Sequence, residues 1–237
     1  MIPIFVANGF RVIAPDLIGF GKSDKFSEPE DYSYSRHIHW VKYLILGLKL
    51  TDIHLFCQDW GGLIGLRILA ENQELFAKAV ASNTFLPTGQ VAVSDAFLKW
   101  RAFSQKSPDF IISKVVQMGS VSPISKEALL AYDAPFPSEE FKAGARIFPS
   151  LVPIKAGDPE ALKNQSAWKS LSQFERPFLT IFGDQDPITK GGESYFQKII
   201  PGTKGQVHQY LSAGHFIQED QGEKLAELVA EFYQKQS

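Results

Sequence analysis

The stretch FCQDWGG, residues 56–62, has the outline of a turn that presents a nucleophile, and Asp59 stands at its tip. An apolar run ends just before this residue and a helix-like pattern begins just after it, as a strand–turn–helix nucleophile elbow requires. The small residues Cys57 and Gly61 flank the tip, where larger neighbours would clash. Gly61 and Gly62 are expected to let the helix start pack closely on the strand, with its first amide groups pointing toward an anion.

The carboxylate of Asp59 limits the chemistry that such a turn can do. A serine at this position would need a base to activate it, whereas a carboxylate is already an anion at neutral pH and can attack carbon directly. Carboxylates attack amides and esters poorly in water, so we expect displacement of a good leaving group from an sp³ carbon, or the opening of a strained ring. Either reaction leaves an alkyl ester on Asp59, and a water molecule must then hydrolyse it.

His215 is the best candidate for the base that activates this water. It follows the strand-like run QVHQYL and precedes the last helix, so it lies on a loop at the carboxyl end of a strand, where α/β sheets bind ligands. The other histidines are less well placed. His37 and His39 are two positions apart on a helix and cannot share a face, and His54 and His208 lie inside predicted strands.

A histidine base of this kind is usually oriented by a carboxylate on its other ring nitrogen. The segment FGDQDPIT offers Asp184 and Asp186 at the end of another predicted strand, and we favour Asp186. The residues GDQDP would also form an ordinary turn without any catalytic role. Either aspartate is therefore a catalytic candidate only because the sequence also offers Asp59 as a nucleophile and His215 as a base.

The elements around these residues predict an α/β fold. Short apolar runs typical of buried parallel strands occupy residues 10–16, 52–58, 77–83 and 177–184. Helix-like patterns occupy residues 36–48, 61–72, 191–199 and 219–234. Strands alternating with helices indicate one parallel sheet with helices on both faces.

The alternation stops between residues 86 and 172, where the sequence is aromatic, helix-like and interrupted by prolines, as in DAPFPSEEF. It resumes at Pro177. We therefore expect residues 1–85 and 173–237 to form one core and residues 86–172, here called the cap, to be a helical insertion into it.

The composition and charge of the chain limit the classes of partner that it can bind. With 237 residues, 44% of them apolar and 21% charged, the chain can bury one large core or a core with one inserted subdomain. The net charge of −2, without a recurring Lys/Arg run, argues against nucleic acid or anionic lipid. The single cysteine fits a reducing compartment, and no apolar run reaches the length of a membrane span, so we expect a cytoplasmic protein.

The sequence resembles the haloalkane dehalogenases of the α/β-hydrolase fold over essentially its whole length. The segments that carry the resemblance are VIAPDLIGFGKSDK, CQDWGGLIGLR, AYDAPFPSEEFKAGARIFP and AGHFIQE, which cover core and cap in the expected order. The chain order of Asp59, Asp186 and His215 is also that of the nucleophile, acid and histidine of α/β-hydrolases. The resemblance implies hydrolysis of small haloalkanes to alcohol and halide through an aspartyl ester, by a monomer that needs no metal or organic cofactor.

In that family the tryptophan after the nucleophile donates its indole N–H to the departing halide, and this residue is Trp60 here. Indole is a donor without an acceptor and suits a large, weakly hydrated anion, although core packing is the alternative role. The family's second halide tryptophan lies early in the cap, where DAFLKWRAF places Trp100. Trp40 and Trp168 are expected to serve packing.

Three further cap residues are expected to wall an apolar substrate pocket: Phe97, Phe136 and Pro137. Aromatic residues that merely cover the core would give the same pattern.

Epoxide hydrolases are an alternative, because they also use an aspartate followed by tryptophan. Ring opening in that family usually takes two cap tyrosines as proton donors to the leaving oxygen. Residues 86–172 contain only Tyr132, which favours the dehalogenase.

A catalytically silent relative is the second alternative. In the family a central strand and a loop of the form His-Gly-Glu-Pro, which supplies a second backbone amide to the halide site, precede the helix that MIPIFVANGF resembles. These 237 residues contain no such motif, so Met1 is expected to be an internal methionine. Each unpaired buried backbone group costs about 1–3 kcal/mol, and several would rival a folding free energy of about 5–15 kcal/mol. We therefore expect these residues alone to be poorly soluble or inactive, and an extended chain to be active.

Overall fold

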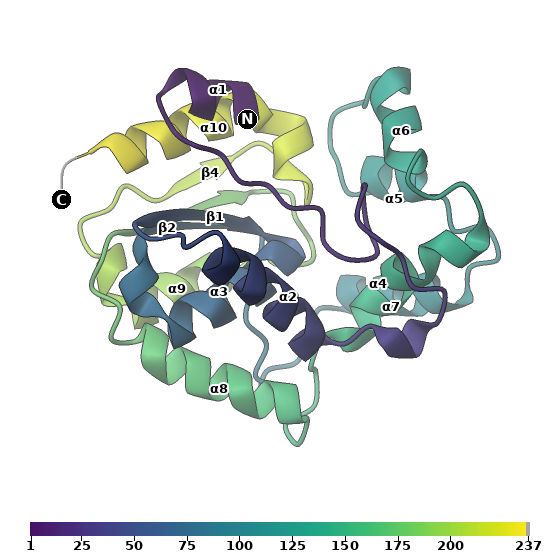
Figure 1. Ribbon diagram of the computed structural model, residues 1–237, viewed down its shortest axis with the longest axis horizontal. Helices are drawn as coiled ribbons and strands as arrows, with labels where there is room; N and C mark the ends of the chain where they lie inside the picture. The colour runs from purple at the N-terminus through teal and green to yellow at the C-terminus, as the bar shows by residue number, and fades with distance from the viewer. Residues whose placement is uncertain (236–237) are drawn as a thin grey trace.

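A computed structural model describes residues 1–235 and shows a parallel sheet of four strands between two layers of helices (Figure 1). Strands that follow one another in the sequence are also neighbours in the sheet. They are β1 Ile53–Gln58, β2 Phe76–Ser82, β3 Phe178–Gly183 and β4 Gln209–Leu211. The predicted α/β fold with a parallel sheet is confirmed.

Helices cover both faces of this sheet, as predicted. Figure 1 shows α1 and α10 over one face and α2, α3, α8 and α9 over the other. The helices are α1 Ile2–Ala7, α2 Tyr34–Gly47, α3 Asp59–Glu71, α4 Asp95–Lys106, α5 Ile112–Met118, α6 Lys126–Asp133, α7 Ala143–Leu151, α8 Pro159–Leu171, α9 Gly192–Ile199 and α10 Ile217–Gln234. Short 3₁₀ helices occupy Pro29–Asp31, Gln73–Leu75, Glu139–Lys142 and Pro201–Thr203. Over residues 1–235, no helix has both the length and the apolar character to cross a membrane.

The prediction of a strand at residues 10–16 is wrong. The segment has no regular structure and is mostly exposed. It starts beside β1, where the rings of Phe10 and His54 lie 5.8 Å apart, and then runs toward the cap helices (Figure 1). A strand requires a neighbour to share its backbone hydrogen bonds, and β1 forms its ladder with β2 alone. The segment passes the edge strand β1 without forming a ladder with it, so the apolar pattern alone does not make a strand.

The core lies on both faces of the sheet because the central strands are apolar throughout. All six residues of β3 are buried. On one face the apolar side chains of the sheet pack against α3, which is buried almost all round, as expected for a helix without a polar face. On the other face Val80 and Ile181 pack in one cluster with Leu225 and Val229 of α10.

The cap leaves the sheet after β2 and returns before β3. Its helices α4 to α7 lie to one side of the sheet, whereas α8 packs against α3 of the core. A separate apolar cluster of Phe110, Phe136 and Ala145 holds this side region together. The boundaries 86–172 remain a prediction.

Three hydrogen bonds join the two ends of the cap. The Trp168 indole N–H donates to the Leu86 carbonyl at 2.8 Å. The side-chain amides of Asn164 and Gln165 donate to the carbonyls of Pro87 and Thr88 at 2.7 and 3.1 Å. The first and last parts of the insertion are therefore fixed beside each other on the core.

Candidate active site

The turn at the end of β1 holds Asp59 in a strained backbone conformation. Its φ of 45° lies in the left-handed region that side chains other than glycine rarely adopt. The amide N–H of Asp59 donates to the Asn83 carbonyl at 3.1 Å, and the hydroxyl of Thr84 donates to the Asp59 carbonyl at 2.8 Å. The segment after β2 thus fixes the turn, as a nucleophile elbow requires.

The two glycines of the elbow differ in what they contribute. A Cβ built on Gly62 would lie 2.0 Å from the Thr84 hydroxyl oxygen, so Gly62 permits the close approach predicted for the helix start. A Cβ on Gly61 would meet nothing within 4 Å. The expectation that Gly61 also makes room for packing is therefore wrong, because this position faces open space.

Three ionisable side chains meet at the carboxyl ends of the strands. The Nε2 atom of His215 lies 3.4 Å from Asp59 Oδ1, and its Nδ1 atom lies 3.0 Å from Asp186 Oδ2. The side chain of Asp59 is 41% exposed and faces the cavity, whereas those of His215 and Asp186 are 12% and 0% exposed. The structure thus brings together the three residues that the sequence selected for nucleophile, base and orienting acid.

The second aspartate of the GDQDP turn lies elsewhere. Asp184 accepts a hydrogen bond from the Ala213 amide at 3.3 Å and, among residues 1–235, forms neither a hydrogen bond nor an ion pair with His215. Asp186 also accepts from the Ile188 amide at 2.8 Å and from the Thr189 hydroxyl. These bonds fix the Asp186 carboxylate against the imidazole, as an orienting carboxylate requires.

The charges in this set are mutually stabilising. Burial alone would lower the pKa of His215, but the hydrogen bonds and charges of Asp186 and Asp59 outweigh it and raise that pKa to about 10. Burial would raise the pKa of Asp186, but the bonds from His215, Thr189 and Ile188 hold it below its usual value. Asp186 and Asp59 therefore both favour the protonated form of the His215 imidazole.

A mostly apolar cavity of about 1310 Å³ lies above Asp59, between the sheet and the cap. Its lining includes Asp59, His215 and both tryptophans predicted to hold a halide, Trp60 and Trp100. Trp60 stands in the first turn of α3, with its ring 4.5 Å from that of Phe148 between centroids. Trp100 stands on α4 of the cap and stacks on Phe110.

The tryptophans differ in whether they serve packing or line the cavity with an indole N–H that has no protein acceptor among residues 1–235. Trp168 is buried and donates its N–H to the Leu86 carbonyl, and Trp40 stacks against Phe26 outside the cavity, so both have the packing role expected. Within the described part of the chain, the indole N–H groups of Trp60 and Trp100 donate to no protein acceptor. Two cavity-lining donors are therefore available to an anion.

The predicted cap residues of the pocket are partly found. Phe97 and Phe136 are nearly buried and line the cavity. Pro137 is exposed and does not line it, so this prediction is wrong. The chain turns outward after Phe136 toward the 3₁₀ helix at Glu139–Lys142, and Pro135 lines the cavity instead.

Asn83, which the sequence analysis did not select, connects the three parts of the site. It is fully buried, and its carbonyl accepts from Asp59 N. Its side-chain amide donates to the Gly214 carbonyl at 2.8 Å and the His215 carbonyl at 3.2 Å, and its Oδ1 accepts from Gly183 N at 2.7 Å. Its position directly after a strand, like that of Asp59, is the one sequence signal that could have identified it.

The fold and the site together define a hydrolase-type α/β protein with an aspartate at the nucleophile elbow. The sequence profile described as the alpha/beta hydrolase fold matches residues 1–221, so the chain belongs to this fold family. It is 52% identical over 98% of its length to a haloalkane dehalogenase of Psychrobacter cryohalolentis, of which it covers 77%. It is 48% identical over 99% of its length to one of Mycolicibacterium paratuberculosis, of which it covers 78%.

A solved structure gives the same result. The tetrameric haloalkane dehalogenase DpaA of Paraglaciecola agarilytica superimposes with a TM-score of 0.87 at 34% identity, covering 96% of this chain and 76% of that one. The chain is a member of the haloalkane dehalogenase family.

Proposed function

We propose that this protein hydrolyses haloalkanes to an alcohol and a halide ion in two steps, through an ester on Asp59. The observation that carries the proposal is the contact of His215 with Asp59 on one ring nitrogen and with Asp186 on the other, at 3.4 and 3.0 Å. Membership of the dehalogenase family supports the same reaction.

In the first step a carboxylate oxygen of Asp59 attacks the carbon that bears the halogen. A C–O bond forms, the carbon–halogen bond breaks, and the halide leaves with the bonding electron pair. We assign to the indole N–H groups of Trp60 and Trp100, which both line the cavity, the role of donors to the departing halide. No base is needed, because Asp59 attacks as an anion.

In the second step water attacks the carbonyl carbon of the Asp59 ester, while His215 Nε2 accepts its proton. The alcohol leaves, Asp59 regains its charge, and one proton is released to solvent overall. The charge of Asp59 is one cause of the raised pKa of His215, and alkylation removes that charge. The imidazole therefore loses its proton more readily at the stage where it must act as a base.

The cavity favours apolar substrates, and we propose small, terminally halogenated alkanes. Phe97, Phe136 and Phe148 line it, and the reacting carboxylate is reached from that apolar space. A terminal carbon leaves the back of the carbon–halogen bond open to attack. Epoxide opening is disfavoured, because the hydroxyl of Tyr132 donates to Glu219 at 2.5 Å instead of being free in the cavity.

All of the groups that act in the two steps come from one chain. We therefore propose a monomer as the working unit, with haloalkane, water and halide as its partners, although the related DpaA is described as tetrameric. The two proposed steps use only side chains and water.

Halide release by an Asp59 variant tests whether Asp59 is the nucleophile. Purified protein is incubated with a 1-bromoalkane in weak buffer, and bromide and acid are measured together. Because His215 contacts both Asp59 and Asp186, we expect equal amounts of both from the wild type, contrary to the inactivity expected from the sequence alone. We expect neither from Asp59→Asn, because the amide is not a nucleophile. Asp184→Asn is the matched control and should keep its activity, since Asp184 lies outside the triad.

The same assay separates the alternatives. Acid from an epoxide but not from the bromoalkane would favour an epoxide hydrolase. A folded wild type that releases no bromide would favour a catalytically silent relative.

A further inference from the structure

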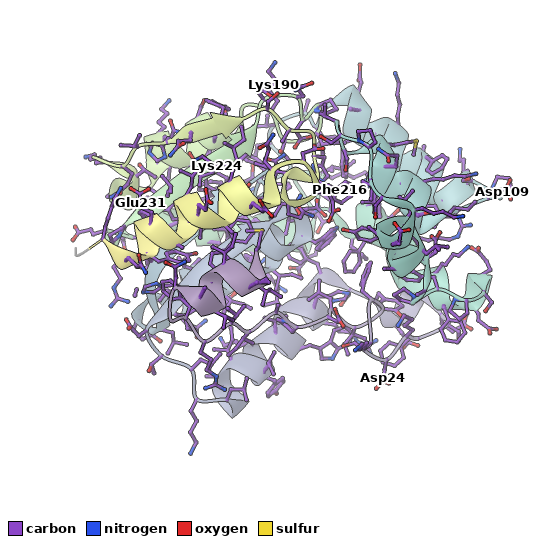
Figure 2. All side chains as sticks on the ribbon, turned by 90° about the horizontal axis from the view of Figure 1, so that it is seen from above. Asp24, Asp109, Lys190, Phe216, Lys224 and Glu231 are labelled. Carbon is purple, nitrogen blue, oxygen red and sulfur yellow. The ribbon has the colours of Figure 1, made fainter. Side chains whose placement is uncertain are left out.

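Two segments that are distant in the sequence meet beside His215. They are residues 214–216 before α10 and residues 119–122 after α5 in the cap. The amide of Phe216 donates to the Gly119 carbonyl at 3.2 Å. A Cβ on Gly119 would lie 2.6 Å from the Phe216 ring, and one on Gly214 would lie 2.5 Å from the Gly119 oxygen, so the two segments touch without room for added side chains. Figure 2 shows Phe216 at the end of α10 nearest the cap.

The carboxylate of Asp220 bonds to both segments. On the cap side, Oδ1 accepts from the amides of Val121 at 3.0 Å and Ser122 at 2.7 Å. On the other side, Oδ2 accepts from the amide of Gly214 at 2.8 Å, one residue before His215. Val121 also lies 3.0 Å from Oδ2. One side chain thus accepts three backbone N–H groups from two elements.

Local structure favours this arrangement. Asp220 stands in the first turn of α10, where negative charge is stabilised, and the backbone leaves helical geometry directly after it, at Gln221 (φ −138°, ψ 31°). Burial would raise the pKa of Asp220, but the amides of Ser122, Val121 and Gly214 hold it below its usual value. Asp220 is therefore ionised in the bridge at neutral pH.

The other bonds to this loop come from the sheet. The side-chain amides of Gln58 and Asn83 donate to the His215 carbonyl at 3.1 Å and the Gly214 carbonyl at 2.8 Å. They hold the loop from the ends of β1 and β2. The hydrogen bonds of Asp220 hold the same loop from the cap side. The loop is therefore fixed between the bonds from the sheet and the bonds of Asp220.

We propose that Asp220 is a positioning residue that keeps His215 in reach of the ester carbonyl by tying its loop to residues 119–122 of the cap. The inference rests on the proposed function, and it predicts an effect on one step only. Attack by Asp59 needs no base, whereas hydrolysis of the ester needs His215 Nε2 in place.

The test is a rapid-mixing experiment with a 1-bromoalkane on Asp220→Asn. An amide at this position would turn N–H donors toward a backbone N–H, so one side of the bridge is lost. We expect a bromide burst of the wild-type rate, followed by alcohol formation slowed on the order of 10- to 100-fold, with the ester accumulating. Glu223→Gln, which removes one exposed charge from the same helix, is the matched control and should behave as wild type.

A second variant disturbs the junction without changing Asp220. Gly119→Ala pushes against the Phe216 ring and should give the same slow second step, whereas the cap control Gly157→Ala, whose Cβ meets nothing within 4 Å, should not. If Asp220→Asn does not fold, the comparison of Gly119→Ala with Gly157→Ala tests whether this junction positions His215.

The outcomes separate the two proposals. Equal slowing of burst and steady state, or no slowing in either variant, would overturn the role of Asp220. If the wild type releases no bromide, the proposed function fails, and amide hydrogen exchange then decides the role of Asp220. Exchange in Asp220→Asn should be faster at residues 214–216 as well as at 121 and 122; unchanged protection at 214–216 would overturn it.

Discussion

At the scale of single residues, the site depends on the charge of one imidazole. The neighbouring carboxylates raise the pKa of His215 to about 10, above an ordinary value of about 6.5. A raised pKa means that the ion pairs add their full stability below about pH 6.5 and lose it as the pH rises toward 10. For Asp186 the lowered pKa gives the opposite sign, with stability present above about pH 4 and lost in acid.

This leads to a prediction for the pH dependence of folding. The difference in urea unfolding free energy between the wild type and His215→Gln should be largest between about pH 4 and 6.5 and should shrink from pH 6.5 to 10. Unfolding curves at pH 5, 7.5 and 9.5 measure it. A difference that grows with pH would show that the histidine is neutral in the folded protein.

The tryptophans permit a matched comparison of halide binding. Trp60→Phe removes the indole N–H of a residue that lines the cavity and should weaken bromide binding on the order of 10- to 100-fold, as expected for a hydrogen bond to a charged group. Trp168→Phe removes a donor that is already bonded to Leu86 and should cost about 1 kcal/mol of stability with bromide affinity unchanged. Quenching of intrinsic fluorescence by bromide measures both affinities. Equal affinities would assign Trp60 to packing.

At the scale of elements, the junction of β1 and α3 depends on one glycine and not on its neighbour. Gly62→Ala should destabilise the protein by about 1–3 kcal/mol and displace Asp59, because its methyl group overlaps Thr84. Gly61→Ala faces open space in a helix and should be neutral or stabilise by up to about 1 kcal/mol. Urea unfolding of the two variants checks this, and an equal loss would mean that crowding at Thr84 is not the cause.

The sequence predicted the elements best where a single run of residues determines them. Asp59, Asp186 and His215 each follow a strand-like run, and parallel strands bring such positions to one edge of the sheet. Residues 10–16 have the same local pattern, but whether they pair depends on a neighbouring strand, which a local pattern cannot specify. The bridges made by Asn83 and Asp220 join residues about a hundred positions apart or more, so spacing gave no sign of them.

At the scale of the whole molecule, the sheet has an open edge at β1. This strand pairs with β2 on one side, and its sequence IHLFCQ has neither a proline nor a charged lysine, aspartate or glutamate to block another strand. We expect the proposed monomer to associate as its concentration rises, which agrees with the poor solubility predicted from the sequence. Light scattering over a concentration series measures this. A constant monomer mass at millimolar concentration would contradict it.

The bonded ends of the cap have a consequence for engineering. Because Trp168, Asn164 and Gln165 fasten the departing chain at residues 86–88, a foreign insertion spliced between these points would start and finish at a fixed spacing. These two points are therefore suitable junctions for chimaeric proteins, in which the cap of one relative replaces the cap of this protein on its own core.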